Sequence, residues 1–107
     1  MAPDHHCVYV VELDPSVRKD RRFAAANPDC ARDLPCLYVG STGLTPEERF
    51  ARHKAGIQDS PIVRRYGMRL VPDMYEHLNP MPYEAAVEME ADLAQDLRDE
   101  GYCVWQR

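Results

Sequence analysis

The stretch C-L-Y-V-G-S-T at residues 36–42 runs from apolar, strand-favouring residues into glycine, serine and threonine. A short apolar run that is stopped by glycine predicts a buried strand over 36–40, followed by a turn over 41–44. The next residues give a strong helix start, because Thr45 is a cap, Pro46 fits the first helical position and Glu48 completes a capping box. Gly56 is well placed to end that helix.

A second apolar stretch, C-V-Y-V-V-E-L at residues 7–13, lies upstream and predicts another buried strand. Asp14 and Pro15 then supply a cap and a first helical position for a short polar helix from Ser16 to about Ala26. The sequence N-P-D at 27–29 ends this helix, and the chain up to residue 35 is expected to be a loop.

Downstream of Gly56, residues 57–67 are expected to be a loop with a short helical turn. A third strand is predicted over 68–71, with 74–78 extending it beyond Pro72. A long helix follows from about Tyr83 to Glu100, and residues 102–105 form a last extended piece. This order of elements predicts an α/β or α+β fold, in which helices flank a small three-stranded sheet of mixed or antiparallel type.

Length and composition predict one domain over residues 1–107. The chain is 45% hydrophobic and 29% charged, which suits a single compact core and argues against disorder. No stretch approaches the roughly 18 apolar residues that a membrane span needs, and residues 1–7 do not resemble a secretory signal. We therefore expect a cytoplasmic protein with no membrane partner.

Four cysteines are present, and no two of them form a C-x-x-C pair. A redox motif or a zinc knuckle is therefore not expected. Two interpretations remain open for Cys7, Cys30, Cys36 and Cys103. Either all four are reduced thiols, some of them buried, or the first three join His5 or His6 in a zinc site built from distant ligands.

The two predicted strands each carry a central tyrosine, Tyr9 and Tyr38, and the helix after the second strand carries the pattern R-x-x-x-H at Arg49 and His53. The long helix carries Glu90, followed three residues later by a leucine. This set of motifs, in this order, resembles the GIY-YIG nuclease superfamily. The segment L-Y-V-G-S-T at 37–42 is similar to the second tyrosine motif of that family.

Three features of the chain depart from the family pattern. Cys7 stands where the first motif usually has glycine, and Gln106 stands where an asparagine is often found. The two tyrosines lie 29 positions apart, whereas the family has a much shorter gap. Residues 15–35 are therefore interpreted as an insertion between the two strands.

The resemblance implies a metal-dependent endonuclease that hydrolyses phosphodiester bonds in DNA, including branched or nicked DNA. Its catalytic residues would be Tyr9, Tyr38, Arg49, His53 and Glu90. Glu90 would hold one Mg²⁺ or Mn²⁺, and Arg49 would bind the scissile phosphate through its planar guanidinium. Tyr9 or Tyr38, made acidic by the metal and the arginine, would take the proton from the attacking water, while His53 steadies a tyrosine or a phosphate.

Helical geometry gives a separate reason to select Glu90. At about 100° per residue, the apolar side chains of the long helix form one stripe, and Glu90 lies at its edge whereas Glu88 lies on the far side. Asp96 also flanks the stripe, so it remains a second candidate. The stripe consists of Ala86, Met89, Leu93 and Leu97.

The total charge of −5 argues against a nucleic-acid partner, but the charge is unevenly distributed. Residues 49–69 hold six basic side chains and one acid, Asp59, whereas residues 84–100 hold seven acids and one arginine. A basic face can bind a phosphate backbone even in an acidic protein. The candidate nucleic-acid contacts on this face are Arg52, Lys54, Arg64 and Arg65.

Several alternatives stay open from the sequence. A second basic cluster over residues 18–22 either extends the binding face or belongs to an ordinary solvated helix. The chain could have the nuclease fold and bind nucleic acid without cleaving it, or it could be a small interaction protein, with or without zinc. The oligomeric state is open between a monomer, a homodimer and a larger complex.

Overall fold

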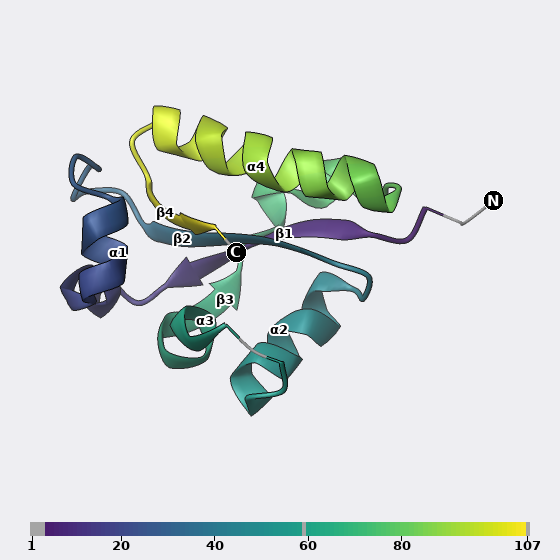
Figure 1. Cartoon of the computed structure of the whole chain (residues 1–107), viewed down its shortest axis with the longest axis horizontal. Helices are drawn as coiled ribbons and strands as arrows, with labels where there is room; N and C mark the ends of the chain where they lie inside the picture. Colours follow the sequence, from purple (N-terminus) through teal and green to yellow (C-terminus); the bar gives the residue numbers. More distant parts are fainter. Residues whose placement is uncertain (1–3, 59, 107) are drawn as a thin grey trace.

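The computed structural model describes residues 4–58 and 60–106, and within them a four-stranded sheet lies between helices (Figure 1). The spatial order is β3-β1-β2-β4, with β1 antiparallel to β2 and β3, and β4 parallel to β2. The expected class, α+β with a small mixed sheet, is confirmed, whereas the expected number of three strands is wrong. The strands are β1 (Cys7–Leu13), β2 (Cys36–Thr42), β3 (Gly67–Leu70) and β4 (Cys103–Gln106).

The additional strand is the last extended piece of the chain. Cys103 and Val104 are fully buried, and β4 pairs with the first four residues of β2. A short apolar segment can be a strand or a packed loop, so its pairing with β2 could not be deduced from its own pattern.

Two layers of helix cover the sheet. Helix α4 (Tyr83–Asp99) packs on one face, and α2 (Pro46–Ala55) and α3 (Pro61–Tyr66) pack on the other (Figure 1). Helix α2 starts as predicted: the Glu48 N–H donates to the Thr45 hydroxyl at 3.1 Å, and the Thr45 N–H donates to the Glu48 carboxylate. Gly56 ends it in the left-handed conformation, with φ of 78°.

The expected single helix from Ser16 to Ala26 is divided. A 3-10 helix, η1 (Pro15–Lys19), is followed by α1 (Arg21–Ala26). The break falls at Asp20, whose carboxylate accepts hydrogen bonds from the backbone N–H groups of Arg22 and Phe23. An aspartate in this position starts a new helix instead of continuing the old one.

The segment between α2 and α4 also differs from expectation. The helical turn expected within 57–67 is α3, and β3 begins at Gly67, one residue before the predicted start. Residues 74–78 do not extend the strand, because they lie largely in two 3-10 turns, η2 (Pro72–Met74) and η3 (Glu76–Leu78). Pro72 explains this, since it has no N–H for a ladder and its fixed φ favours a turn.

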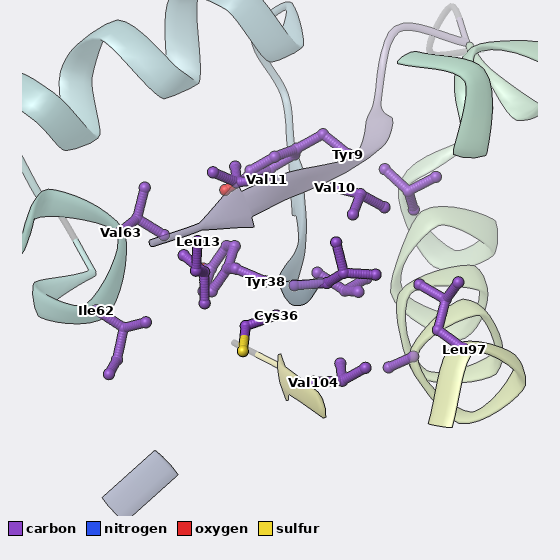
Figure 2. Close-up of a cluster of buried hydrophobic side chains, with 14 of the residues drawn as sticks. Tyr9, Val10, Val11, Leu13, Cys36, Tyr38, Ile62, Val63, Leu97 and Val104 are labelled. Atoms are coloured by element: carbon purple, nitrogen blue, oxygen red, sulfur yellow. The ribbon is translucent and has the colours of Figure 1, made fainter. Parts of the chain in front are cut away.

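The core lies on both faces of the β1–β2 pair. Figure 2 shows Leu97 of α4 reaching one face, while Ile62 and Val63 of α3 reach the other. Both strands are buried along most of their length, as their unbroken apolar runs predict. The register sets Cys7 opposite Thr42 and Leu13 opposite Cys36, so the pair has two well-separated ends.

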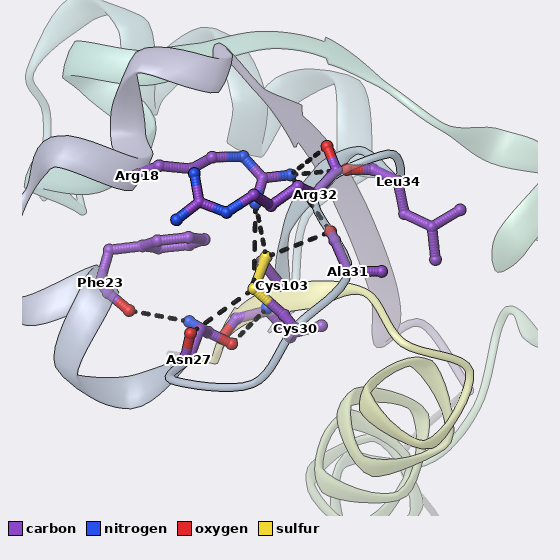
Figure 3. Close-up of a disulfide and its surroundings, with 9 residues drawn as sticks. Arg18, Phe23, Asn27, Cys30, Ala31, Arg32, Leu34 and Cys103 are labelled. Atoms are coloured by element: carbon purple, nitrogen blue, oxygen red, sulfur yellow. Dashed lines mark hydrogen bonds between the residues drawn. A yellow bond between two sulfur atoms is a disulfide. The ribbon is translucent and has the colours of Figure 1, made fainter.

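A disulfide joins Cys30 to Cys103 (Figure 3). The expectation of four reduced thiols is therefore wrong, and only Cys7 and Cys36 are free. The physical reason is β4, which brings Cys103 to the insertion with a Cα–Cα separation of 5.0 Å, within the range that disulfides span. Disulfide connectivity cannot be deduced from a sequence alone.

The expected alternative, a zinc site from His5 or His6 with Cys7, Cys30 and Cys36, is also wrong. Cys30 is bonded to another cysteine, and the other two thiols lie at opposite ends of the β1–β2 pair, about 20 Å apart at 3.4 Å per residue. Burial also raises the pKa of both free thiols, whereas zinc binds the thiolate.

The sequence predicted no membrane span, and it placed one acid in the basic segment 49–69. Among residues 4–58 and 60–106, no helix has both the length and the apolar composition needed to cross a bilayer. Asp59, the one acid of the basic segment 49–69, lies outside the described residues.

Candidate active site

A buried tyrosine–histidine pair forms the centre of the candidate site. The Tyr9 hydroxyl oxygen on β1 and Nε2 of His53 on α2 are 2.8 Å apart, and both side chains are fully buried. The backbone N–H of Ser60 donates to Nδ1 of His53 at 3.0 Å. Nδ1 therefore accepts a hydrogen bond. A neutral ring then carries its proton on Nε2, and this N–H donates a hydrogen bond to the Tyr9 oxygen.

Tyr38 of β2 packs against both members of the pair. Its ring centroid lies 6.0 Å from that of Tyr9 and 5.7 Å from that of His53, the latter in an edge-on arrangement. These distances are typical of attractive aromatic contacts. The structure thus brings three of the predicted site residues into one aromatic cluster, which is closed to solvent.

Gly40 allows this cluster to form. It lies opposite Tyr9 in the β1–β2 register, and a Cβ atom at this position would be 2.7 Å from the Tyr9 hydroxyl and 3.0 Å from the Tyr38 ring. No side chain fits there without displacing a buried tyrosine. The glycine of the second tyrosine motif is therefore required by close approach, and not by a turn.

Arg49 lies one helical turn before His53 on α2 and interacts with the Tyr9 hydroxyl. Burial, followed by the neighbouring Tyr38, raises the pKa of Tyr9 above its ordinary value, and the Arg49 guanidinium acts in the opposite direction. Tyr9 is therefore a neutral phenol at pH 7. The sequence predicted that an arginine lowers the pKa of this tyrosine, and Arg49 does act in that direction. Burial, which that prediction did not include, raises the pKa by more than Arg49 lowers it.

Glu90 approaches the sheet from the other face. Its two carboxylate oxygens accept hydrogen bonds from the Ser41 hydroxyl at 2.9 Å and from the Gln106 amide at 3.1 Å. Glu90 is 8% exposed, whereas Glu88 and Asp96 are exposed. The burial expected from the helical stripe is thus confirmed for Glu90, and Asp96 is removed as its competitor.

The two parts of the site lie on opposite faces of β2, and among the described residues Arg49 is the only predicted catalytic residue that lines the cavity at the end of that strand. Alternate residues of a strand face opposite sides, so Tyr38 and Gly40 face α2 while Ser41 reaches Glu90 on α4. Strand β4 pairs with β2 only as far as Val39. Beyond that point an open cavity of about 600 Å³ lies at the strand end, lined by Ser41, Thr42, Gly43, Leu44, Arg49, Arg52 and Gln58.

Glu90 is the residue of the candidate site that would hold a divalent cation. Each of its oxygens has one hydrogen-bond donor, which leaves lone pairs for a metal ion. Within the described ranges, no group of three or more histidine, cysteine, aspartate or glutamate side chains could hold a metal. A metal held by Glu90 alone would be of the kind that binds through one or two carboxylates and takes its other ligands from water and phosphate, as Mg²⁺ and Mn²⁺ do.

The four predicted nucleic-acid contacts do not form one cluster. Arg52 lines the cavity at the end of β2. Lys54 donates to the backbone carbonyls of Arg64 and Gly67, so it joins α2 to α3 and β3. The Arg64 side chain lies beside Gly56, and Arg65 lines a separate groove. Only Arg52 therefore adds to the charge of Arg49 at the cavity.

Three polar residues of the site were not selected from the sequence. Ser41 directly follows the glycine of the tyrosine motif, so its position in the motif was the available signal. Gln106 was noted only as a departure from a family asparagine, yet it binds Glu90. Ser60 had no signal, because its contribution is a backbone N–H.

No family model matches this chain, and neither a curated protein nor a solved structure matches it.

Proposed function

We propose that the chain is a metal-dependent endonuclease that hydrolyses phosphodiester bonds in DNA through a one-metal site of the GIY-YIG type. The observation that supports this most is the buried Tyr9–His53 pair beneath Gly40 and beside Arg49. Tyr75 offers a contrast within the same core. Its buried hydroxyl has no hydrogen-bond partner among the described residues, so the fold tolerates a buried tyrosine without a histidine.

Arg49 and Arg52 bind the scissile phosphate in this proposal. Both line the cavity at the end of β2, and a guanidinium can hold two phosphate oxygens through its planar fork. Arg49 Nη2 donates to the Gln58 carbonyl at 2.6 Å. Because that partner is an exposed backbone carbonyl, Arg49 can exchange the bond for a phosphate oxygen without leaving a buried group unsatisfied.

In this proposal Tyr9 first loses its phenol proton to bulk solvent and then, as the phenolate, accepts the proton of the attacking water. The His53 Nε2–H donates to the Tyr9 oxygen, and a hydrogen bond of this direction favours the charged phenolate over the phenol. Arg49 favours the same form, while burial opposes both. Tyr38 packs against both rings and fixes their positions.

Glu90 is the residue that would hold Mg²⁺ or Mn²⁺, with Ser41 and Gln106 fixing the orientation of its carboxylate. When bound, the ion supplies positive charge to the phosphate that is being cleaved. The other residues act on the opposite face of β2, so the phosphodiester would lie across the strand end.

One observation favours a second function, a module that binds nucleic acid without cleaving it. Tyr9 is fully buried and its pKa is raised, whereas a proton acceptor must meet water and must be able to ionise. This alternative has the same fold and the same arginines. It differs only in whether bonds are broken.

A plasmid-nicking assay with Mg²⁺ or Mn²⁺ separates the two functions. We expect nicking that is abolished by a chelator and reduced roughly 100-fold or more by Glu90→Ala, equivalent to about 2.7 kcal/mol of transition-state stabilisation. Glu88→Ala, an exposed carboxylate on the same helix, is the matched control and should cleave like the wild type. Equal activity of wild type and Glu90→Ala overturns the catalytic assignment, and binding without cleavage under either metal selects the binding module.

The DNA substrate, a homodimer or larger complex, and a cytoplasmic location all stay predictions. The Cys30–Cys103 disulfide weighs against the last of these, because disulfides are rare in the reducing cytosol. Fractionation of cells that express the chain, with alkylation of free thiols, would test the location and the disulfide together.

A further inference from the structure

A second groove lies away from the cavity at the end of β2. It has a volume of about 430 Å³, which is within the range of roughly 300–1,000 Å³ that small-molecule sites occupy. Its walls come from the insertion, from α3 and from β4. The lining residues are Asp20, Arg21, Arg22, Ser60, Pro61, Ile62, Arg65, Tyr66 and Trp105.

The groove is positively charged. Arg21, Arg22 and Arg65 are all exposed, and their side chains form no hydrogen bond or ion pair with the rest of the described chain. Asp20 is the one acid in the lining, and its carboxylate already accepts hydrogen bonds from two backbone N–H groups at the start of α1. Three guanidinium groups are therefore available to an anionic ligand.

Aromatic rings accompany this charge. Trp105 and Tyr66 are half-buried and line the same groove. Trp105 is the only tryptophan of the chain. Arginines that track a phosphate backbone, together with aromatic rings on which bases stack, are the features by which proteins bind single-stranded nucleic acid.

The groove adjoins the candidate active site at three points. Trp105 lies opposite Tyr38 in the β2–β4 register. Gln106, the next residue, donates to Glu90. Ser60 lines the groove and also donates its N–H to His53. A strand held in the groove would therefore lie beside the buried cluster of Tyr9, Tyr38 and His53, while Arg49 and Arg52 line the separate cavity at the end of β2.

We propose that this groove binds a single-stranded DNA segment, with one base stacked on Trp105 and the phosphates held by Arg21, Arg22 and Arg65. The inference rests on the proposed function to the extent that it makes the substrate a branched DNA, whose unpaired arm lies in the groove. It also gives the insertion a role, because Arg21 and Arg22 belong to α1.

Trp105 is itself the reporter for the test. An oligothymidylate of about 12 nucleotides, within the range that single-strand binding folds cover, is added to the whole protein in the presence of a chelator. We expect quenching of the tryptophan fluorescence, and weaker binding of a duplex of the same length. With three phosphate contacts to a single strand, log Kd should rise with log salt with a slope of about 2.

Variants locate the contacts. Arg21→Gln and Arg65→Gln should each weaken binding several-fold and lower the salt slope by about 0.7. Arg98→Gln, which removes the same charge on α4 on the other face of the sheet, is the matched control and should bind like the wild type. Trp105→Ala should weaken binding of a labelled oligonucleotide by about tenfold, and Trp105→Phe should restore most of it.

Specific results overturn the inference. The first is tryptophan fluorescence that does not change when oligonucleotide is added in excess. The second is equal affinity for the duplex and the single strand, and the third is that Arg98→Gln weakens binding as much as Arg65→Gln does. The proposed function fails separately. Quenching without any nicking contradicts the nuclease but supports the groove, whereas nicking that is dependent on Glu90 but insensitive to Trp105 and Arg65 contradicts the groove alone.

Discussion

The two ends of the β1–β2 pair are held in different ways. At the end near Tyr9 and Gly40 the backbone is regular strand, and polar side chains bond to one another in the interior. At the other end the insertion, residues 15–35, leaves the sheet and returns to it. There a disulfide and two polar side chains, Arg18 and Asn27, hold an irregular backbone (Figure 3).

The two ends of the β1–β2 pair differ in what their polar side chains bond to. In the insertion the Leu34 carbonyl has no ladder partner, so Arg18 donates to it at 2.8 Å, and Asn27 bonds both the N–H and the carbonyl of Val104. Polar side chains there complete the backbone. At the end near Gly40 the Asn79 side chain does the same for Val8, whose N–H and carbonyl it bonds. The Tyr9–His53 and Ser41–Glu90 side chains at this end, in contrast, bond to each other.

Opening the disulfide should have the largest effect on stability, and it should act on the insertion end alone. The bond closes a loop of 73 residues, for which the chain-entropy model gives about 4 kcal/mol. We expect a reducing agent, or Cys30→Ser, to lower the free energy of unfolding in urea by about that amount. Nicking under conditions where the protein stays folded should be largely retained, because the contacts of the candidate active site lie at the other end.

Cys7→Ser is the control for the disulfide, since Cys7 is a free thiol on the same sheet. It should leave the urea midpoint nearly unchanged. If reduction shifts the midpoint no more than Cys7→Ser does, the covalent link contributes nothing to the insertion end. If reduction abolishes nicking in a folded protein, the two ends are not independent.

Tyr9→Phe is the corresponding change at the end that holds the candidate active site. It should lower the free energy of unfolding by less than loss of the disulfide does. It removes the hydroxyl that accepts from His53, and loss of a buried hydrogen-bond partner costs about 1–3 kcal/mol. Because the phenol oxygen is also the proposed proton acceptor, nicking should fall far more than stability does. Urea unfolding and the plasmid assay, run on the same preparation, measure the two effects.

Tyr75→Phe is the matched control for this change. Tyr75 is equally buried, its hydroxyl has no hydrogen-bond partner among the described residues, and burial raises its pKa to about 12. Removal of the Tyr75 hydroxyl should leave the free energy of unfolding equal or slightly higher and should leave nicking unchanged. Equal losses from both variants would mean that the Tyr9–His53 bond has no special role.

The sequence predicted the end near Tyr9 and Gly40, which holds the candidate active site, better than the end that holds the insertion. Strand and helix boundaries near Thr45 and Gly56 follow from local rules of capping and periodicity, and the burial of Glu90 follows from its angle on the helix. The disulfide, the break at Asp20 and the pairing of β4 depend on contacts between distant segments. The raised pKa of Tyr9 depends on burial, which a motif does not encode.

The smallest effect is expected at Asp14, the residue immediately before the insertion. The N–H of Ser16 donates to the Asp14 carboxylate at 2.9 Å, and this bond lowers the pKa of Asp14 below its ordinary value. The charged form is therefore favoured in the folded chain. Its contribution is complete above the unfolded pKa of about 3.9 and is lost as the pH falls through the lower folded value.

Asp14→Asn separates this titration from the cap itself. Asparagine still accepts the Ser16 hydrogen bond, but it does not ionise. The variant should therefore match the wild type in urea unfolding below the folded pKa of Asp14 and be slightly less stable than it at neutral pH, because only the wild type gains from ionisation. A stability difference that stays constant from neutral pH down to strong acid would mean that the carboxylate charge does not contribute, and that the start of the insertion is held by the hydrogen bond alone.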